Sequence, residues 1–222
     1  MTPTDELFNA VHSGDLAAVR RLIAADPGLA RARNADTLSI LHFARFMGRP
    51  DVLEALIDAG PALDVFEAAA IGVADVVARC LADQPTLLNA RSGDGFTALH
   101  LASYYGAPKV VDLLLGRGAD VEAVTQNFLE NMPIHAAAAG RHLDICAMLL
   151  EHGADINARQ HGGFVPLHTA AQNGDRAMTD LFLSHGADPR VANDEGKTGA
   201  DIAASQGTIE IAALLRCAAA AV

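Results

Sequence analysis

The chain has 222 residues, 51% of them hydrophobic, and is therefore long enough to bury a substantial core in one domain or two. Its 27 acidic residues outnumber 16 basic ones, and the formal net charge of −11 disfavours nucleic acid as a partner. No apolar run approaches the roughly 20 residues of a membrane span, and the acidic start lacks the pattern of a signal peptide. We therefore expect a globular, cytoplasmic protein without a membrane partner.

Short apolar segments recur along the chain, and most of them end at a glycine. We align the segments on this end residue and call it the mark. The position six residues before the mark holds, in chain order, Phe8, His42, Phe66, His100, His135, His168 and Asp201. These positions are separated by 34, 24, 34, 35, 33 and 33 residues. A period near 33 residues predicts a repeat architecture of seven units.

A second apolar segment follows each mark. Residues four and eight positions after the mark are apolar in every unit, and this spacing places both on one face of a helix. The pairs are Ala18 and Leu22, Val52 and Leu56, Val76 and Cys80, Val110 and Leu114, Ile145 and Leu149, Met178 and Phe182, and Ile211 and Leu215. Gly-Ala-Asp at 118–120, 153–155 and 186–188 provides a glycine that can end such a helix. Each unit is predicted to contain a helix, a tight turn, a second helix and a polar connector.

Two stretches make this pattern specific: DGFTALHLASYYGAPKVVDLLLGRGADVEA at 94–123 and GGFVPLHTAAQNGDRAMTDLFLSHGADPRV at 162–191. Both resemble the ankyrin repeat in period and in the T-P-L-H-x-A signature, and the resemblance extends over roughly residues 5–216. It implies an all-α solenoid whose connectors form hairpin-like fingers, and weaker end units that cap the stack. We predict one domain over 1–222, with units at approximately 4–33, 34–60, 61–91, 92–124, 125–158, 159–191 and 192–218.

The third unit departs from the period. Only 24 residues separate His42 from Phe66, and the missing segment falls between Gly60 and Phe66, where a finger is expected. A neutral deletion would explain this departure. The alternative is a functional gap between the neighbouring fingers that receives a side chain or loop of a partner.

The fifth unit departs in two ways. Its connector, AVTQNFLENM, is two residues longer than its equivalents and carries apolar Phe128 and Leu129. Arg141 stands where other units have the glycine between the two helices. A left-handed conformation at this residue would cost about 1 kcal/mol, unless the turn shifts by one residue.

The repeated histidines are predicted to be structural. Histidines at one repeat position on packed helices lie about 10 Å apart, whereas zinc requires nitrogens about 2 Å from one ion. We therefore expect no metal and no cofactor. The resemblance implies instead that these side chains form hydrogen bonds that brace the connectors, and it assigns this role to His42, His100, His135 and His168.

Catalytic motifs are missing from the sequence. The stretch DEGKT at 194–198 resembles the end of a phosphate-binding loop, but Val191 stands where that motif needs its first glycine. Cys80 and Cys146 fall on the predicted buried stripes about 20 Å apart, too far for a disulfide, and are interpreted as core residues. His100 and Tyr104 are helical neighbours without the third group that a nucleophilic site needs. The chain is therefore not expected to be an enzyme or to bind a small-molecule substrate.

The two residues before the interhelix mark vary from unit to unit, and the resemblance places them on the concave side, where such domains contact protein partners. In units two to four this pair is apolar, and the finger tips beside it add further apolar side chains. The predicted partner-binding residues are Leu38, Phe46, Met47, Ile71, Phe96, Tyr104, Tyr105, Phe128, Leu129 and Phe164. An exposed patch of this kind is typical of a binding surface.

Two alternatives remain open for this surface. The first alternative is that some of these side chains pack against a neighbouring finger and have no role in binding. The second alternative is that the protein is a regulatory or inhibitory subunit, which binds an enzyme through this same concave surface.

Overall fold

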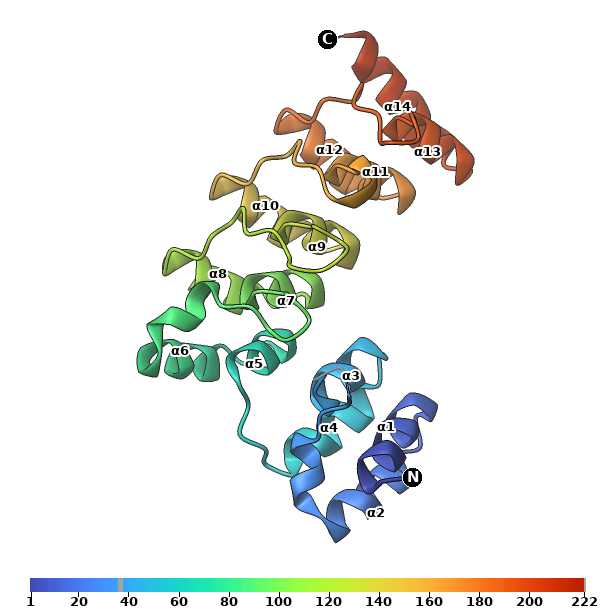
Figure 1. Ribbon diagram of the computed structural model, residues 1–222. Coiled ribbons are helices and arrows are strands. Elements are labelled where there is room, and N and C mark those ends of the chain that lie inside the picture. The colour runs from blue at the N-terminus through green and yellow to red at the C-terminus, as the bar shows by residue number, and fades with distance from the viewer. Residues whose placement is uncertain (36–37, 222) are drawn as a thin grey trace.

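The structure is a computed structural model that describes residues 1–35 and 38–221. This part of the chain forms seven helix-turn-helix pairs, which stack in chain order (Figure 1). The first helices of the pairs are α1 (Pro3–Ser13), α3 (Ile40–Phe46), α5 (Val65–Ile71), α7 (Ala98–Tyr105), α9 (Pro133–Gly140), α11 (Pro166–Gln172) and α13 (Gly199–Ser205). The second helices are α2 (Leu16–Ala25), α4 (Pro50–Asp58), α6 (Ala74–Asp83), α8 (Pro108–Gly116), α10 (Leu143–Glu151), α12 (Arg176–Ser184) and α14 (Ile209–Ala220). The predicted all-α solenoid is confirmed.

Side-chain caps and left-handed residues set the ends of the first helices. Thr97 begins α7, where its hydroxyl accepts from the amide of His100. Gly106 ends α7 at a φ of +74°, and a Cβ there would lie 2.3 Å from the ring of His142 in the next unit. The turn therefore needs glycine both for its backbone and for close packing.

Arg141 adopts the left-handed conformation itself, with φ +64° and ψ +33°. The turn after α9 does not shift, and the side chain instead donates to the Asn173 carbonyl of the next unit. This unit therefore keeps the common turn at the cost of an unfavourable backbone conformation.

The predicted stripe on the second helices is correct in five units and displaced by one residue in two. In α2 and α6 the buried residues are Val19 and Ile23, and Val77 and Leu81. Their predicted neighbours, Ala18, Leu22, Val76 and Cys80, are only half-buried. Both helices lead into proline-initiated 3-10 turns, η1 (Pro27–Arg31) and η2 (Pro85–Asn89), which pack back on them and change the face that meets the core. Cys80 is thus not a core residue, whereas Cys146 is fully buried.

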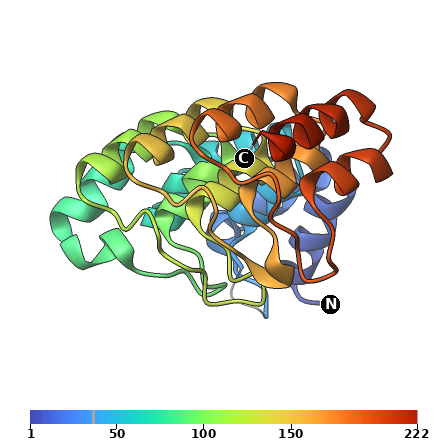
Figure 2. The ribbon, with the colours of Figure 1, turned by 90° about the horizontal axis from the view of Figure 1, so that it is seen from above.

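The connectors project to one side of the helical layer, as seen from above in Figure 2. Three of them are closed by single antiparallel bridges: Arg33 with Ser39, Arg91 with Thr97, and Ala192 with Thr198. We call the connectors before α3 and α7 the second and fourth fingers.

The third unit has no finger. Residues 59–64 lead directly from α4 to α5, whereas residues 84–97 connect α6 to α7 (Figure 1). The buried core is divided at the same point: one apolar cluster extends from Leu7 to Leu56, and a larger one extends from Val65 to Leu215. The missing connector therefore coincides with a discontinuity in the core.

Candidate functional site

A ladder of histidines holds the fingers of the last four units against the helices. In His100, Nδ1 accepts from the Thr97 amide at 3.3 Å, and Nε2 donates to the Asn131 carbonyl of the next finger at 3.1 Å. His135 and His168 repeat both bonds, with Nε2 donating to Ala158 and Val191 carbonyls at 3.0 Å. Each of these rings therefore joins its own unit to a connector that follows it.

Burial keeps these rings neutral. It lowers the pKa of His100 and of His135 to about 4, although the carbonyl hydrogen bonds act in the opposite direction. The pKa of His168 is also lowered by burial. A neutral imidazole has one donor and one acceptor nitrogen, and these geometries use both.

His42 occupies the same repeat position but makes different contacts. Its Nδ1 lies 3.9 Å from Asp94 Oδ2, beyond hydrogen-bonding distance, and its ring meets the edge of Tyr105 with 5.6 Å between centroids. Neither ring nitrogen has a hydrogen-bond partner among the residues that the structure describes. The connector that His42 would brace is the one that the third unit lacks.

A groove of about 400 Å³ lies between the fingers and the first helices. Its walls are mainly apolar, and six of the ten residues predicted to bind a partner line it: Leu38, Phe46, Phe96, Tyr104, Tyr105 and Leu129. The other four, Met47, Ile71, Phe128 and Phe164, lie outside it. Phe128 is 78% exposed at the tip of its connector, whereas Ile71 and Phe164 pack partly against the core.

The two tyrosines of the groove differ. Tyr104 is 40% exposed. Tyr105 is half-buried: the guanidinium of Arg45 lies 5.2 Å from its ring centroid, and Arg45 also donates to its backbone carbonyl at 2.7 Å. These contacts join α3 directly to the end of α7, so that Tyr105 supports the scaffold as well as facing the groove.

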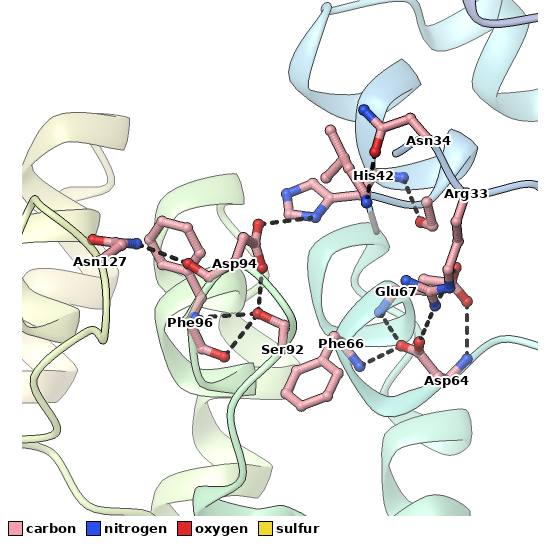
Figure 3. Close-up of polar contacts among 12 residues, drawn as sticks. Arg33, Asn34, His42, Asp64, Phe66, Glu67, Ser92, Asp94, Phe96 and Asn127 are labelled. Carbon is pink, nitrogen blue, oxygen red and sulfur yellow. Dashed lines mark hydrogen bonds and ion pairs between the residues drawn. The ribbon is translucent and has the colours of Figure 1, made fainter. Parts of the chain in front are cut away.

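A second, polar cavity of about 310 Å³ adjoins the groove between the second and fourth fingers. Arg33 pairs with Asp64 at 2.7 Å and lies 3.5 Å from Glu67, which caps the start of α5 (Figure 3). From the fourth finger, Asp94 faces His42 and accepts from the Ser92 hydroxyl (Figure 3). Leu38, His42 and Asp94 line both cavities.

Sequence patterns had pointed to the gap but not to these charged residues. Asp64 and Glu67 form a capping box, D-x-x-E, which was a readable signal for a helix start directly after the gap. The position of Asp94 opposite His42 depends on how closely the fourth finger approaches α3, and a repeat alignment does not contain that distance.

Within residues 1–35 and 38–221, no cluster of three histidine, cysteine or acidic side chains is arranged to hold a metal ion. Over the same residues, no helix combines the length and apolar character needed to cross a bilayer.

Comparison with known proteins shows similarity to one repeat family. A family model described as ankyrin repeats in three copies matches residues 7–125, 65–160 and 134–222. The chain is 36% identical over 131 residues to a probable E3 ubiquitin-protein ligase, XBOS31, of Oryza sativa subsp. japonica, covering 54% of this chain and 29% of that protein. It is 36% identical over 135 residues to the B-cell lymphoma 3 protein homolog of Mus musculus, covering 55% and 30%. A putative ankyrin repeat protein of fowlpox virus, FPV014, is 27% identical over 166 residues, covering 71% and 37%. The aligned regions thus make up about a third of each of these relatives.

Proposed function

The chain belongs to the ankyrin-repeat family, and from that premise we propose that it binds a protein partner in the groove of its second to fourth units. Ankyrin repeats are in general protein-protein interaction modules rather than catalytic ones. The observation that carries the proposal for this groove is its apolar lining with large side chains left exposed: Phe46 is 63% exposed and Tyr104 is 40% exposed. Exposed aromatic clusters of this kind are typical of recognition surfaces.

The mechanism that we propose is rigid presentation. Each repeat packs on its neighbours, and the histidine bonds to the fingers fix the walls of the groove before a partner arrives. Little conformational entropy is then lost on binding, which favours affinity. Tyr104 is suited to be an anchor because an aromatic ring buries a large area while losing few torsions.

A regulatory or inhibitory subunit of an enzyme complex is the second candidate. Two of the similar proteins are named as ubiquitin ligases, and the matched repeats form only a part of each of those longer chains. Repeats that accompany an enzyme in this way support the second candidate. The same groove would then hold the enzyme. Co-purification with an enzyme whose activity changes on binding would favour this candidate over a simple scaffold.

The test uses a partner captured with the wild-type protein and titrated calorimetrically against variants. Tyr104→Ala should weaken binding by roughly 2 kcal/mol, the size of a hot-spot residue, without changing the melting temperature. Tyr105→Ala should weaken binding and also lower the melting temperature, since Arg45 loses its contact with the ring and keeps only the bond to the backbone carbonyl. Gln172→Ala, exposed on α11 at the polar end of the same face, is the matched control. If Gln172→Ala abolishes binding while Tyr104→Ala binds normally, the groove is not the recognition surface.

A further inference from the structure

The cavity between the second and fourth fingers, called the notch here, is the place that a third finger would occupy. It is lined by Arg33, His42, Asp64, Glu67, Arg91 and Asp94, among other residues, and it opens beside the apolar groove. An engineered cavity of about 150 Å³ accommodates a benzene molecule. The notch, at about 310 Å³, therefore has room for one or two residues of another chain.

The histidine ladder indicates what this other chain should offer. His100, His135 and His168 each donate to a backbone carbonyl of a following connector at 3.0 to 3.1 Å. The ring of His42 lines the notch at the same repeat position, but no carbonyl of the described residues accepts from it. A backbone carbonyl supplied by a loop from outside would complete this rung of the ladder.

The charges around the notch indicate a second feature of the loop. Arg33 is paired with Asp64, and Arg91 donates to the Val124 carbonyl at 2.6 Å. Asp94, in contrast, has no lysine or arginine within ion-pair distance among the described residues, and burial lowers the pKa of the facing His42. The notch thus holds a carboxylate that no lysine or arginine of the described residues neutralises, in a chain whose net charge is −11.

We propose that a loop of the partner protein takes the place of the missing third finger. One of its backbone carbonyls accepts a hydrogen bond from the His42 imidazole, and one of its lysine or arginine side chains pairs with Asp94. This inference rests on the proposed function and specifies the partner's chemistry: a basic loop beside an apolar anchor. The charge of the chain disfavours a second copy of itself in this place.

The probe is a phage-displayed library of disulfide-closed loops with nine random residues, selected on the wild-type protein. Lysine or arginine should be enriched in the loops that bind. Asp94→Asn should raise the dissociation constant of such a loop about tenfold or more, and His42→Leu should do the same. His42→Gln, which keeps an N–H donor, should recover most of the affinity.

Two controls keep the result interpretable. Glu151→Gln removes the same charge from an exposed position on the second-helix side and should leave loop binding unchanged. Insertion of a copy of residues 91–97 after Gly60 should fill the notch from within and remove loop binding. Thermal melts of every variant establish that it is folded.

The proposal is overturned if no loop is enriched, if the enriched loops lack a basic residue, or if Asp94→Asn and Glu151→Gln bind them equally well. It is also overturned if the loops depend on Tyr104 but not on His42 or Asp94. In that last case the groove remains a binding surface and only the role of the notch fails, so the two proposals are tested separately.

Discussion

The histidines at one repeat position meet two different surroundings in this molecule, and the surroundings decide which contacts they make. His100 and its counterparts in the fifth and sixth units are buried, neutral and bonded through both ring nitrogens. His42 sits at the equivalent helical position, yet its two ring nitrogens have no hydrogen-bond partner within the described residues. The difference arises from the connector that should follow it, because a histidine can brace only a finger that exists.

The buried histidines make the stability of the fold depend on pH. The pKa of His100 and of His135 is about 4 in the folded state, below the ordinary value of 6.5. Between these values the unfolded chain binds more protons than the folded one, so acid favours unfolding. The free energy of unfolding should therefore fall as pH decreases from 6.5 to 4, by on the order of 3 kcal/mol for each of these two residues. Urea titrations at a series of pH values measure this.

His100→Ala isolates one of these contributions. At pH 7 the variant should be less stable by about 1 to 3 kcal/mol, because a buried hydrogen-bonding group is lost, and this deficit should shrink as pH approaches 4. His161→Ala, at an exposed position, should show neither effect. A deficit that stays constant across the range would mean that the His100 ring is not held neutral by the fold.

At the scale of elements, the repeat determines where the helices lie, and the connectors determine where a helix or a unit departs from the repeat. The period and the apolar spacing predicted all seven helix pairs, since each unit repeats a short apolar segment and a second helix with an apolar face. The buried faces of α2 and α6 could not be predicted as well, because the 3-10 turns after them change how those helices meet the core. Of the ten apolar positions predicted from the sequence for the candidate site, six line the groove and four lie outside it. The position of Asp94 opposite His42 could not be predicted from the sequence, since it depends on how closely the fourth finger approaches α3.

Arg141 offers a test of how a turn between two helices is stabilised. Its left-handed backbone is unfavourable for a residue with a side chain, whereas its guanidinium donates to the Asn173 carbonyl. Arg141→Gly should raise the free energy of unfolding by up to about 1 kcal/mol. Arg141→Ala should lower it, because the variant keeps the strain and loses the bond. Chemical denaturation measures both variants: if Arg141→Gly also lowers stability, the bond outweighs the backbone strain, and if the two variants lower it equally, the left-handed backbone carries no cost.

The whole molecule is a stack in which each unit depends on its neighbours, so an interruption in the stack has consequences beyond one connector. The break lies between α4 and α5, where the link 59–64 replaces a finger and the core divides into two apolar clusters. Leu63 packs partly against both clusters. The Arg45 contacts with Tyr105 connect α3 to α7 on the groove side. The groove therefore spans the least continuous part of the core.

We expect the first two units to unfold at a lower free energy than the rest of the stack. The smaller apolar cluster lies on the N-terminal side of the break. Its units have fewer interfaces with packed neighbours, and these interfaces contribute much of the stability of a repeat protein. In hydrogen exchange followed by mass spectrometry, amides of α2 and α4 should exchange faster than those of α8 and α10. The other end of the stack is the matched control, because α12 and α14 are also near a terminus but belong to the larger cluster. Leu63→Ala should widen the difference between the two parts. Equal protection of α4 and α10 would instead show that the molecule unfolds as one cooperative unit despite the missing finger.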